Sequence, residues 1–312
     1  MRQAFPFLFL TDDGGLVYRR RAYEKACELI KEHGITTVFS SFRPWSDHLV
    51  AAKLKKRFPD VHWIADFRDL PVDRVRNDIW WPALQTWWGK KVISAAGEIW
   101  VVSEGQQQQL SDWHPRIKVV RNALRMLPKE EIAPVTERFS IVYTGSLYPD
   151  LQSMKPLVEA IQYLLAKGSL RVENLSLVYR GKDQFAFLAQ TKSLPPEILD
   201  VQPPIAPAAA HDLQHNGQLL LLLNWSAPGY YGVLTAKLWD YLASGRPILA
   251  LVNGPADPEL KDIIGGANAG AVFSKNEQRE VINWLEMAYT KWEETGSLPW
   301  AVNRENLKQY LQ

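Results

Sequence analysis

The sequence predicts an α/β protein of two Rossmann-like domains that face each other across a cleft. Short apolar runs alternate with helical segments along the chain, which is typical of parallel sheets covered by helices. The alternation pauses once, over residues 125–138. There the chain is polar, holds two prolines and lacks periodicity, as expected of an interdomain linker. The length of 312 residues also agrees with two domains.

The first half, residues 1–124, is predicted to form a reduced N-terminal domain. In its first helical segment Val50, Leu54 and Phe58 recur at i, i+4 and i+8 and share one face, and Ser46 is the expected N-cap. A complete Rossmann half has about six strands. Here the predicted strands are 36–39, 62–65, 98–102 and 118–120, with Phe5–Leu10 as a candidate fifth, and the predicted helices are 46–57, 82–95 and 104–112.

The second half, residues 139–297, repeats the alternation and is predicted to be the C-terminal domain. Gly245 stands where a helix would stop, and Pro247 follows it. The tail, residues 298–312, is predicted to end in a helix, with packing back on the N-terminal domain as one option. The predicted strands are 139–144, 175–179, 219–224 and 248–252, and the predicted helices are 155–166, 184–192, 235–244 and 277–292, with a short helix after the prolines at 203–207.

Composition excludes several classes of protein. Lys and Arg total 36 and Asp and Glu total 34, and the net charge of +2 does not favour nucleic-acid binding through bulk charge. Cys27 is the one cysteine, which excludes an intramolecular disulfide framework and a Cys-rich zinc site. The longest aliphatic run, Leu219–Leu223, is far shorter than the ~20 residues of a membrane span. We therefore expect a cytoplasmic protein.

Residues that follow predicted strands are the first candidates for a site, because open α/β sheets bind ligands beyond the carboxyl ends of their strands. Gly145 and Ser146 follow the first strand of the second half. A glycine there lets the backbone approach a ligand, and the next helix start can hold a phosphate, although a plain tight turn is the simpler interpretation. Arg180 and Lys182 flank Gly181 after the next strand, a pattern that suits either a diphosphate or a solvated basic turn.

The richest cluster follows the leucine strand. In the helix 235–244, Lys237, Asp240 and Tyr241 occur at i, i+3 and i+4 and share one face. A lysine near the helix N-terminus can meet phosphates, and Asp240 can accept hydrogen bonds from two sugar hydroxyls. A surface Lys–Asp pair explains the same spacing equally well. The candidate binding residues of this cluster are Asn224, Tyr231, Gly232, Lys237, Asp240 and Tyr241.

Two further groups of polar residues are candidates for chemistry. Asp66, Arg68 and Asp69 follow the predicted strand 62–65, either as catalytic groups directed into the cleft or as an ion pair that braces a loop. His211 and His215 stand at i and i+4 in a predicted helix, but the sequence offers no third ligand. We therefore expect no metal site.

Five segments of the chain carry a family resemblance. The most specific are AKLWDYLASGRPILAL at 236–251 and the segment 40–69, which ends in ADFRD. Supporting segments are IWVVSEG at 99–105, VVRNAL at 119–124 and IVYTGSLY at 141–148. Together, and in this order, they resemble bacterial glycosyltransferases of the GT-B fold, in the retaining group 1 or family-four class.

The resemblance implies an enzyme that transfers a sugar from a nucleotide-sugar donor to a glycan or lipid-linked acceptor in cell-surface polysaccharide biosynthesis. Gly145 and Ser146 would lie near the donor's phosphates, Arg180 and Lys237 would neutralise them, and Asp240 would hold the ribose. Arg68 stands where many of these enzymes place a histidine near the reacting sugar. Neither a cofactor nor a metal is implied, because cations and helix N-termini can stabilise the departing diphosphate.

The chain departs from the family's pattern at three positions. Asp240 replaces the usual glutamate, and Gly232 replaces an acidic residue eight positions earlier. Ala123 follows Asn122 where the family has glycine. The first half is also short, since residues 1–39 alone precede the SSFRP segment, and this shortness is the second reason to expect a reduced N-terminal domain.

Two other functions stay open beside the transferase. A non-catalytic GT-B partner subunit would bind the nucleotide-sugar without transfer, and an epimerase of the same fold would need acid–base groups that the sequence does not identify. Eight of the thirteen tryptophans precede residue 115, notably Trp80, Trp81, Trp87 and Trp88. They are either part of the core or an apolar patch for a membrane-bound acceptor. A homodimer and peripheral contact with the inner membrane face are therefore further options.

Overall fold

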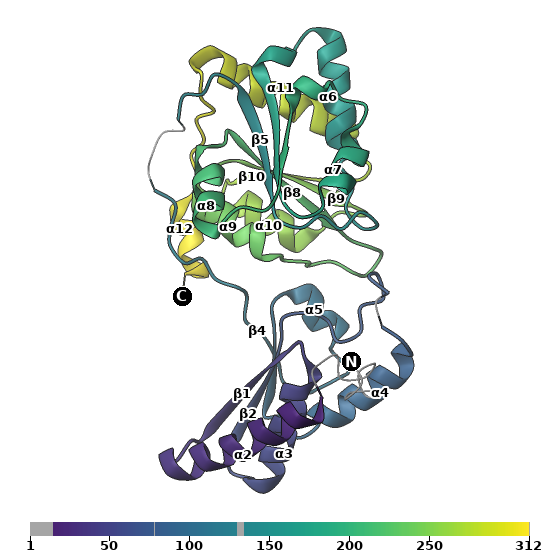
Figure 1. Ribbon diagram of the computed structural model, residues 1–312, viewed down its shortest axis with the longest axis vertical. Coiled ribbons are helices and arrows are strands. Elements are labelled where there is room, and N and C mark those ends of the chain that lie inside the picture. The colour runs from purple at the N-terminus through teal and green to yellow at the C-terminus, as the bar shows by residue number, and fades with distance from the viewer. Residues whose placement is uncertain (1–14, 78, 130–133, 312) are drawn as a thin grey trace. The chain divides into compact units, whose positions relative to one another are not determined.

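The computed structural model describes residues 15–77, 79–129 and 134–311, which form two compact units that divide between Arg121 and Asn122 (Figure 1). Each unit is built on a parallel β-sheet flanked by helices, so the predicted α/β class with two Rossmann-like halves is confirmed. The candidate strand Phe5–Leu10 lies outside the described residues.

The first unit has a four-stranded sheet in its described part, in the order β1-β2-β3-β4, with every neighbouring pair parallel. Helices α2 and α3 pack on each other around Ile30, Leu54 and Val61. Its strands are β1 (Thr37–Phe42), β2 (His62–Phe67), β3 (Glu98–Val101) and β4 (Ile117–Val119), and its helices are α2 (Leu16–His33), α3 (Trp45–Arg57), α4 (Pro82–Ile93) and α5 (Glu104–Gln109).

Helix α3 confirms its predicted face but not its predicted cap. Leu54 is buried, with Val50 and Phe58 packed beside it, as the spacing requires. The N-cap position belongs to Pro44, and Ser46 lies buried inside the helix, so the prediction of Ser46 as N-cap was wrong. The reason is tertiary, because the ring of Trp45 packs among aromatic neighbours and draws the first turn of the helix into the core.

The second unit has a six-stranded parallel sheet in the order β10-β9-β8-β5-β6-β7. Strands β7 and β10 were not predicted, because each lies at a sheet edge, is only partly buried and lacks a long apolar run. Gly245 ends α9 in the left-handed conformation, as predicted. The strands are β5 (Phe139–Thr144), β6 (Leu175–Arg180), β7 (Leu199–Gln202), β8 (Leu219–Trp225), β9 (Ile248–Asn253) and β10 (Gly270–Ser274). The helices are α6 (Lys155–Lys167), α7 (Gln184–Thr191), α8 (Pro207–Asn216), α9 (Ala236–Ser244), α10 (Pro258–Gly266), α11 (Gln278–Thr295) and α12 (Arg304–Leu307), with short 3-10 turns η1 (Val172–Asn174), η2 (Pro196–Ile198) and η3 (Lys308–Tyr310).

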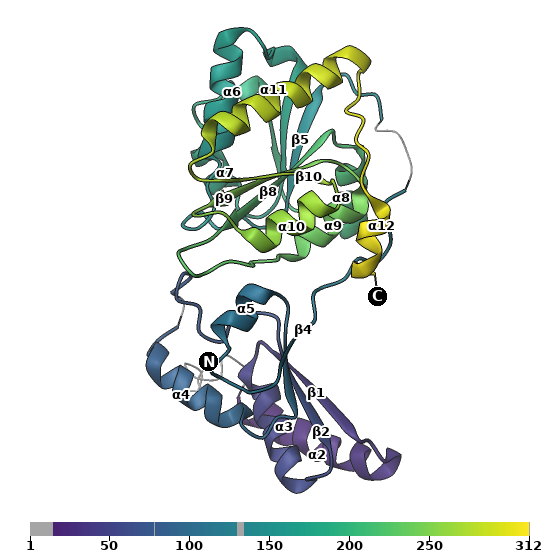
Figure 2. The same ribbon diagram turned by 180° about the vertical axis from the view of Figure 1, so that it is seen from behind.

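Helices cover both faces of this second sheet. Helices α6, α7 and α11 lie on one face and α8, α9 and α10 on the other (Figures 1 and 2). Side chains of β8 alternate between the two cores: Leu219, Leu221 and Leu223 enter the first, and Leu220 and Leu222 the second. This double burial explains why the strand reads as an unbroken leucine run.

The tail and the segment after Arg121 both pack on the second unit. Leu307 and Leu124 belong to the core beneath α9 and α10, and the Leu124 amide donates to the Tyr310 carbonyl at 2.8 Å. The tail therefore contributes to the core of its own unit through its apolar side chains. Residues 122–129 belong to this second unit as well, whereas the sequence predicted an N-terminal domain that ends at residue 124 and a linker that begins at residue 125. Over the described ranges, no helix is both long and apolar enough to cross a bilayer.

Gly270, the first residue of β10, tests how closely this edge strand packs. It has φ +138°, and a Cβ there would overlap the backbone carbonyl of Ile248 on β9. We expect Gly270→Ala to lower the free energy of unfolding by about 1–3 kcal/mol, measured by urea denaturation.

Gly265 supplies the matched control. It lies in α10 with nothing near its missing Cβ, so Gly265→Ala should be neutral or stabilise by up to ~1 kcal/mol. Equal effects of the two substitutions would contradict the close contact of β10 with β9.

Candidate functional site

The candidate site lies where the order of strands in the second sheet reverses. From the central β5 the chain builds outward through β6 and β7, and then returns to build β8, β9 and β10 on the other side. Strands β5 and β6 pair along six positions, but β5 and β8 pair only at Ile141–Leu219 and Val142–Leu220. The two strands therefore separate toward their carboxyl ends, and their loops leave in opposite directions. Such a switch point is where open α/β sheets bind ligands.

The loop after β5 is held tightly at this point. Gly145, with φ +95°, donates its amide to the Arg180 carbonyl at 2.8 Å, and its own carbonyl accepts from the Tyr179 hydroxyl at 3.0 Å. The Leu147 amide donates to the carboxylate of Asp183 at 2.9 Å. The predicted residues Gly145 and Ser146 thus form a braced loop of which Gly145 is exposed and Ser146 half-buried.

Lys237 projects from the first turn of α9 onto that loop. Its Nζ donates to the Tyr143 hydroxyl at 2.7 Å and to the Ser146 carbonyl at 2.8 Å, and lies 4.2 Å from the centre of the Tyr143 ring. Burial lowers the pKa of Lys237 to about 7, and the nearby Asp183 carboxylate acts weakly in the opposite direction. The structure therefore brings three predicted residues, Gly145, Ser146 and Lys237, together around a desolvated ammonium group.

Two residues that complete this arrangement were missed by the sequence analysis. Tyr143 holds Lys237, and burial raises the pKa of its hydroxyl, which therefore stays neutral. Gln152 lies buried in the loop, where its amide donates to the Leu223 carbonyl at 2.7 Å and accepts from the Tyr148 amide at 2.9 Å. It fills the space that opens between β5 and β8. A polar residue in a loop carries no periodic signal, so only the fold reveals its role.

Asn224 and Gly232 support the loop that leads into α9, and Tyr231 lies in that loop. The buried Asn224 amide donates to the Val233 carbonyl at 3.1 Å, while its Oδ1 has no hydrogen-bond partner among the described residues. The buried Gly232 amide donates to Asp257 at 2.9 Å, and Gly232 adopts φ +76°. Tyr231 is half-buried. Asn224 and Gly232 are therefore buried supports of the loop and do not face solvent.

Arg180 is already paired. Its guanidinium contacts the Asp200 carboxylate at 2.7 Å and also donates to the carbonyls of Tyr179 and Asp200. Asp200 lies on β7, a strand that was not predicted, so this partner of Arg180 could not be predicted either. Lys182, two residues later, is exposed.

Lys237, Asp240 and Tyr241, which were predicted to share one face of α9, have different surroundings in the structure. Asp240 faces away from the β5 loop and lines a cavity of about 630 Å³ together with Arg125, His211 and Trp239. Burial raises the pKa of Asp240, and His211 and Arg125 oppose that shift. Tyr241 is fully buried, its hydroxyl accepts from the Thr144 amide at 3.2 Å, and burial raises its pKa to about 12. We therefore assign Tyr241 a supporting role at the end of β5.

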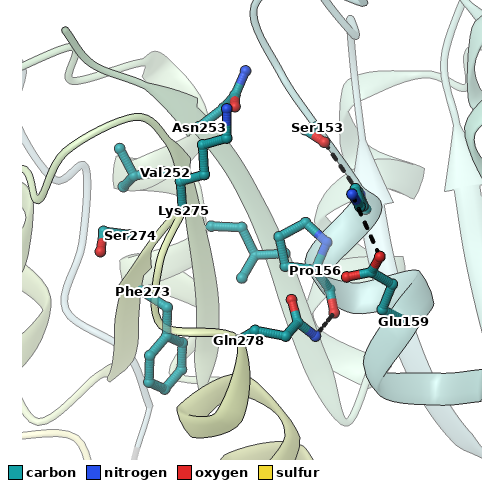
Figure 3. Close-up of a pocket in the computed structure, with 11 residues that line it drawn as sticks. Ser153, Pro156, Glu159, Val252, Asn253, Phe273, Ser274, Lys275 and Gln278 are labelled. Carbon is teal, nitrogen blue, oxygen red and sulfur yellow. Dashed lines mark hydrogen bonds and ion pairs between the residues drawn. The ribbon is translucent and has the colours of Figure 1, made fainter. Parts of the chain in front are cut away.

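A smaller cavity, of about 150 Å³, lies beyond the carboxyl ends of β9 and β10 (Figure 3). Lys155 and Glu159 form an ion pair at 3.6 Å on its α6 side, and the Gln278 amide donates to the Pro156 carbonyl at 2.9 Å. None of the predicted site residues lines it.

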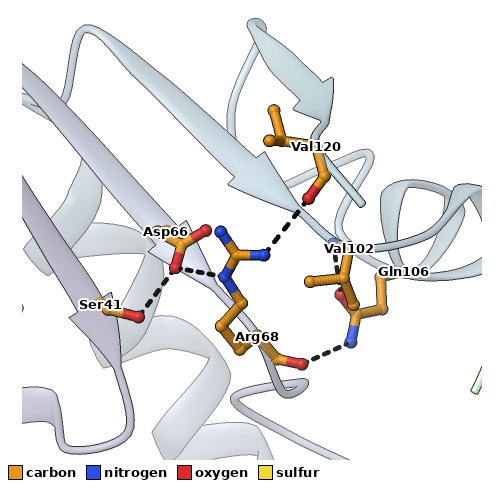
Figure 4. Close-up of polar contacts among 6 residues, drawn as sticks. All are labelled: Ser41, Asp66, Arg68, Val102, Gln106 and Val120. Atoms are coloured by element: carbon orange, nitrogen blue, oxygen red, sulfur yellow. Dashed lines mark hydrogen bonds and ion pairs between the residues drawn. The ribbon is translucent and has the colours of Figure 1, made fainter. Parts of the chain in front are cut away.

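In the first unit, Asp66 and Arg68 form a braced pair at the carboxyl end of β2 (Figure 4). One oxygen of the buried Asp66 carboxylate accepts from Ser41 and from Arg68 Nε, both at 2.8 Å. Arg68 also reaches the Val120 carbonyl at 3.4 Å, and the Gln106 amide holds the Arg68 carbonyl at 3.3 Å. Asp69 is half exposed and lies 3.6 Å from Arg76. These contacts match the loop-bracing interpretation, and they leave the Arg68 side chain about one third exposed.

The histidines suggest no metal centre. His211 and His215 both line the larger cavity, and His215 contacts the Ser244 carbonyl at 3.3 Å. In the parts of the chain that the structure describes, no three His, Cys, Asp or Glu side chains come together as a metal site.

Comparisons with known proteins show the fold. No family model and no curated protein matches the sequence. A solved structure of TarM is similar at 12% identity and a TM-score of 0.55, over 91% of this chain and 54% of TarM. A TarM variant from S. aureus, in complex with fondaparinux, alpha-GlcNAc-glycerol and UDP, matches with the same identity and TM-score over 80% of this chain and 48% of its own. A putative UDP-N-acetylglucosamine 2-epimerase from Listeria monocytogenes matches at 11% identity and a TM-score of 0.49, over 93% and 77%.

The chain thus spans about half the length of the TarM structures that it matches. With its two parallel-sheet units, it has the predicted GT-B type of fold, composed of two Rossmann-like domains.

Arg68→Ala tests the bracing role of the Asp66–Arg68 pair. The substitution leaves a buried carboxylate without its cation, so we expect the free energy of unfolding to fall by about 1–3 kcal/mol in urea denaturation. The control is Arg76→Ala, which removes a pair at 3.6 Å that involves a half-exposed Asp69 and should cost less than ~1 kcal/mol. A stability of Arg68→Ala equal to that of the wild type would contradict the bracing role.

Proposed function

We propose that this protein is a glycosyltransferase that moves a sugar from a nucleotide-sugar donor to a glycan or lipid-linked acceptor in cell-surface polysaccharide biosynthesis. The observation that carries the proposal is Lys237, a desolvated ammonium held over the switch point of a GT-B fold. The TarM complex that contains UDP and alpha-GlcNAc-glycerol supports a nucleotide and a sugar-bearing acceptor as ligands of this fold. From the family resemblance we further expect transfer with retention of the anomeric configuration.

The second unit would bind the donor's diphosphate through Lys237 and the Gly145–Ser146 loop. In the structure the ammonium is bonded to two neutral oxygens, while burial has removed most of its hydration. A diphosphate is a stronger acceptor than a phenol or a peptide carbonyl and would restore the charge balance. Lys237 also lies in the first turn of α9, where the helix dipole favours an anion. This pairing would stabilise the diphosphate as it leaves the sugar.

Asp240 would hold the ribose. It lies one turn after Lys237 on α9 but lines the larger cavity, which Lys237 and the Gly145–Ser146 loop do not line, so a donor bound to both residues would have to extend around α9. A carboxylate accepts hydrogen bonds from two vicinal hydroxyls. Arg180, already paired with Asp200, would contribute to the local field rather than lose its partner. No metal is needed in this proposal.

In the first unit, Arg68 with Asp66 and Asp69 would serve the reacting sugar and the acceptor. About one third of the Arg68 side chain is exposed, and its ion pair with Asp66 sets its orientation. The same bracing contacts favour a second candidate function, a non-catalytic GT-B subunit that binds the nucleotide-sugar. A labelled donor incubated with acceptor lipid extract separates the two, because the transferase forms a labelled product and the binding subunit does not.

Substitutions in α9 test the donor site. We expect Lys237→Ala and Asp240→Ala each to weaken nucleotide-sugar binding by about tenfold or more in isothermal titration, because each removes a charged hydrogen bond to the ligand. Lys192→Ala is the matched control, since this lysine is exposed at the end of α7 in the same unit. Unchanged affinity in both α9 variants would refute the site.

The lowered pKa of Lys237 predicts a pH dependence of binding. Because the free protein's lysine titrates near pH 7 and the ligand prefers the protonated form, affinity should be highest below that pH and fall as pH rises through it. A nucleotide-sugar suits the titration, because its diphosphate diester keeps a constant charge over about pH 6–9.

Lys237→Arg is the control for this titration. Its guanidinium stays charged over the whole range, so its affinity should lose the pH dependence. An identical slope for the wild type and Lys237→Arg would assign the titration to another group.

A further inference from the structure

Helix α4 of the first unit exposes one of its two tryptophans, Trp87, together with Leu84. Its buried positions Gln85, Gly89 and Ile93 recur at i, i+4 and i+8 and face the core. Leu84 and Trp87, on another side of the helix, are 44% and 60% exposed. Trp88, the other tryptophan of α4, is half-buried, with its ring centroid 4.9 Å from that of the buried Trp45, so the helix buries part of its apolar surface and exposes the rest.

The turn before α4 extends this exposed surface. Trp80 and Trp81 are 66% and 58% exposed, and their rings meet edge to face with centroids 6.4 Å apart. We call Trp80, Trp81, Leu84 and Trp87 the tryptophan face. Large aromatic residues gathered on a surface mark an interaction site.

The exposure is enforced by the packing of α4. A Cβ at Gly89 would lie 2.6 Å from the ring of Trp113 and 2.8 Å from that of Trp45, so the helix presses directly on these two buried tryptophans. A roll of the helix that buried Trp87 would bring an indole to a place that admits no methyl group. The unit therefore has an aromatic core, and the tryptophan face is excluded from it.

Two exposed cations, Arg74 and Lys91, occur in the segment that carries this surface. From residue 73 to 91 the sequence has four basic residues, Arg74, Arg76, Lys90 and Lys91, and two acidic residues, Asp78 and the buried Asp73. Arg76 and Lys90 pair with Asp69 and Asp112. Lys91 is exposed and lies with its Nζ 5.5 Å from the centre of the Trp87 ring, and α4 itself contains no acidic residue.

We propose that the tryptophan face is a docking surface for an anionic lipid bilayer. Indole rings favour the interface between headgroups and acyl chains, and lysines beside them favour anionic headgroups. Helix α4 has 12 residues, too few to span a bilayer, so it would lie in the plane of the interface. The proposal does not depend on the nucleotide site, which is built from residues of the second unit.

The test is sedimentation of the full chain with vesicles of phosphatidylcholine alone and of phosphatidylcholine mixed with phosphatidylglycerol. We expect binding to the mixed vesicles that weakens with salt. Trp81→Ala combined with Trp87→Ala should reduce the partition coefficient by about tenfold or more, and Lys91→Ala by ~5-fold. Phe185→Ala is the control, because this ring is 90% exposed in the second unit, and it should bind like the wild type.

The outcomes separate this proposal from the proposed function. A wild type that does not bind the mixed vesicles, or tryptophan variants that bind them normally, would overturn the lipid surface. Light scattering that shows self-association of the wild type but not of the double variant would assign the face to a second copy of the chain instead. Nucleotide-sugar affinity, measured on the same double variant, should be unchanged, so failure of donor binding would be seen independently.

Discussion

The burial of β8 is the constraint on which the second unit depends. Every residue from Leu219 to Trp225 is buried, and its leucines alternate between two cores. A strand of this kind is stable only between two layers of helices, which fixes the three-layer architecture. It also confines polar chemistry to the carboxyl end of the strand. There β5 and β8 separate. Gln152 binds the Leu223 carbonyl of β8, and Lys237 binds the Ser146 carbonyl in the loop after β5.

The site combines a loop that is already held by hydrogen bonds with a lysine, Lys237, whose ammonium donates to two neutral oxygens, the Tyr143 hydroxyl and the Ser146 carbonyl. Three side chains hold the β5 loop before any ligand arrives: the hydroxyls of Tyr143 and Tyr179 donate to backbone carbonyls, and the Asp183 carboxylate accepts from the Leu147 amide. Lys237 is different, because its ammonium has lost water and gained only neutral acceptors. Preorganised donors in a site of low polarity are what stabilise negative charge most effectively. Arg180 and Arg68, in contrast, have carboxylate partners.

The sequence predicted the parts of this fold that are governed by local patterns. The leucine run, the alternation of strands and helices, and the Gly245 stop all express burial or backbone geometry that neighbouring residues decide. Ser46 shows the limit, because the aromatic neighbours of Trp45 override a sound capping signal. At the site, Gly145, Ser146 and Lys237 were predicted, since they follow strands. Tyr143 and Gln152 were not, because a tyrosine in a buried strand reads as core and a glutamine in a loop reads as solvent-exposed. The division of Lys237, Asp240 and Tyr241 among three directions depends on what lies beside each side of α9, which spacing alone does not state.

The joining of Leu124 to the tail has a consequence for the topology of the second unit. Leu124 and Leu311 form a parallel β-bridge, and the ring of Tyr310 packs against Trp239 on α9 with centroids 5.4 Å apart. The first and last described segments of the unit are therefore neighbours in space, beside the helix that carries Lys237 and Asp240. A chain whose ends meet can be closed by a short linker and reopened elsewhere. The second unit is thus suited to circular permutation, with new ends placed in an exposed loop such as the one around Lys192 and Ser193.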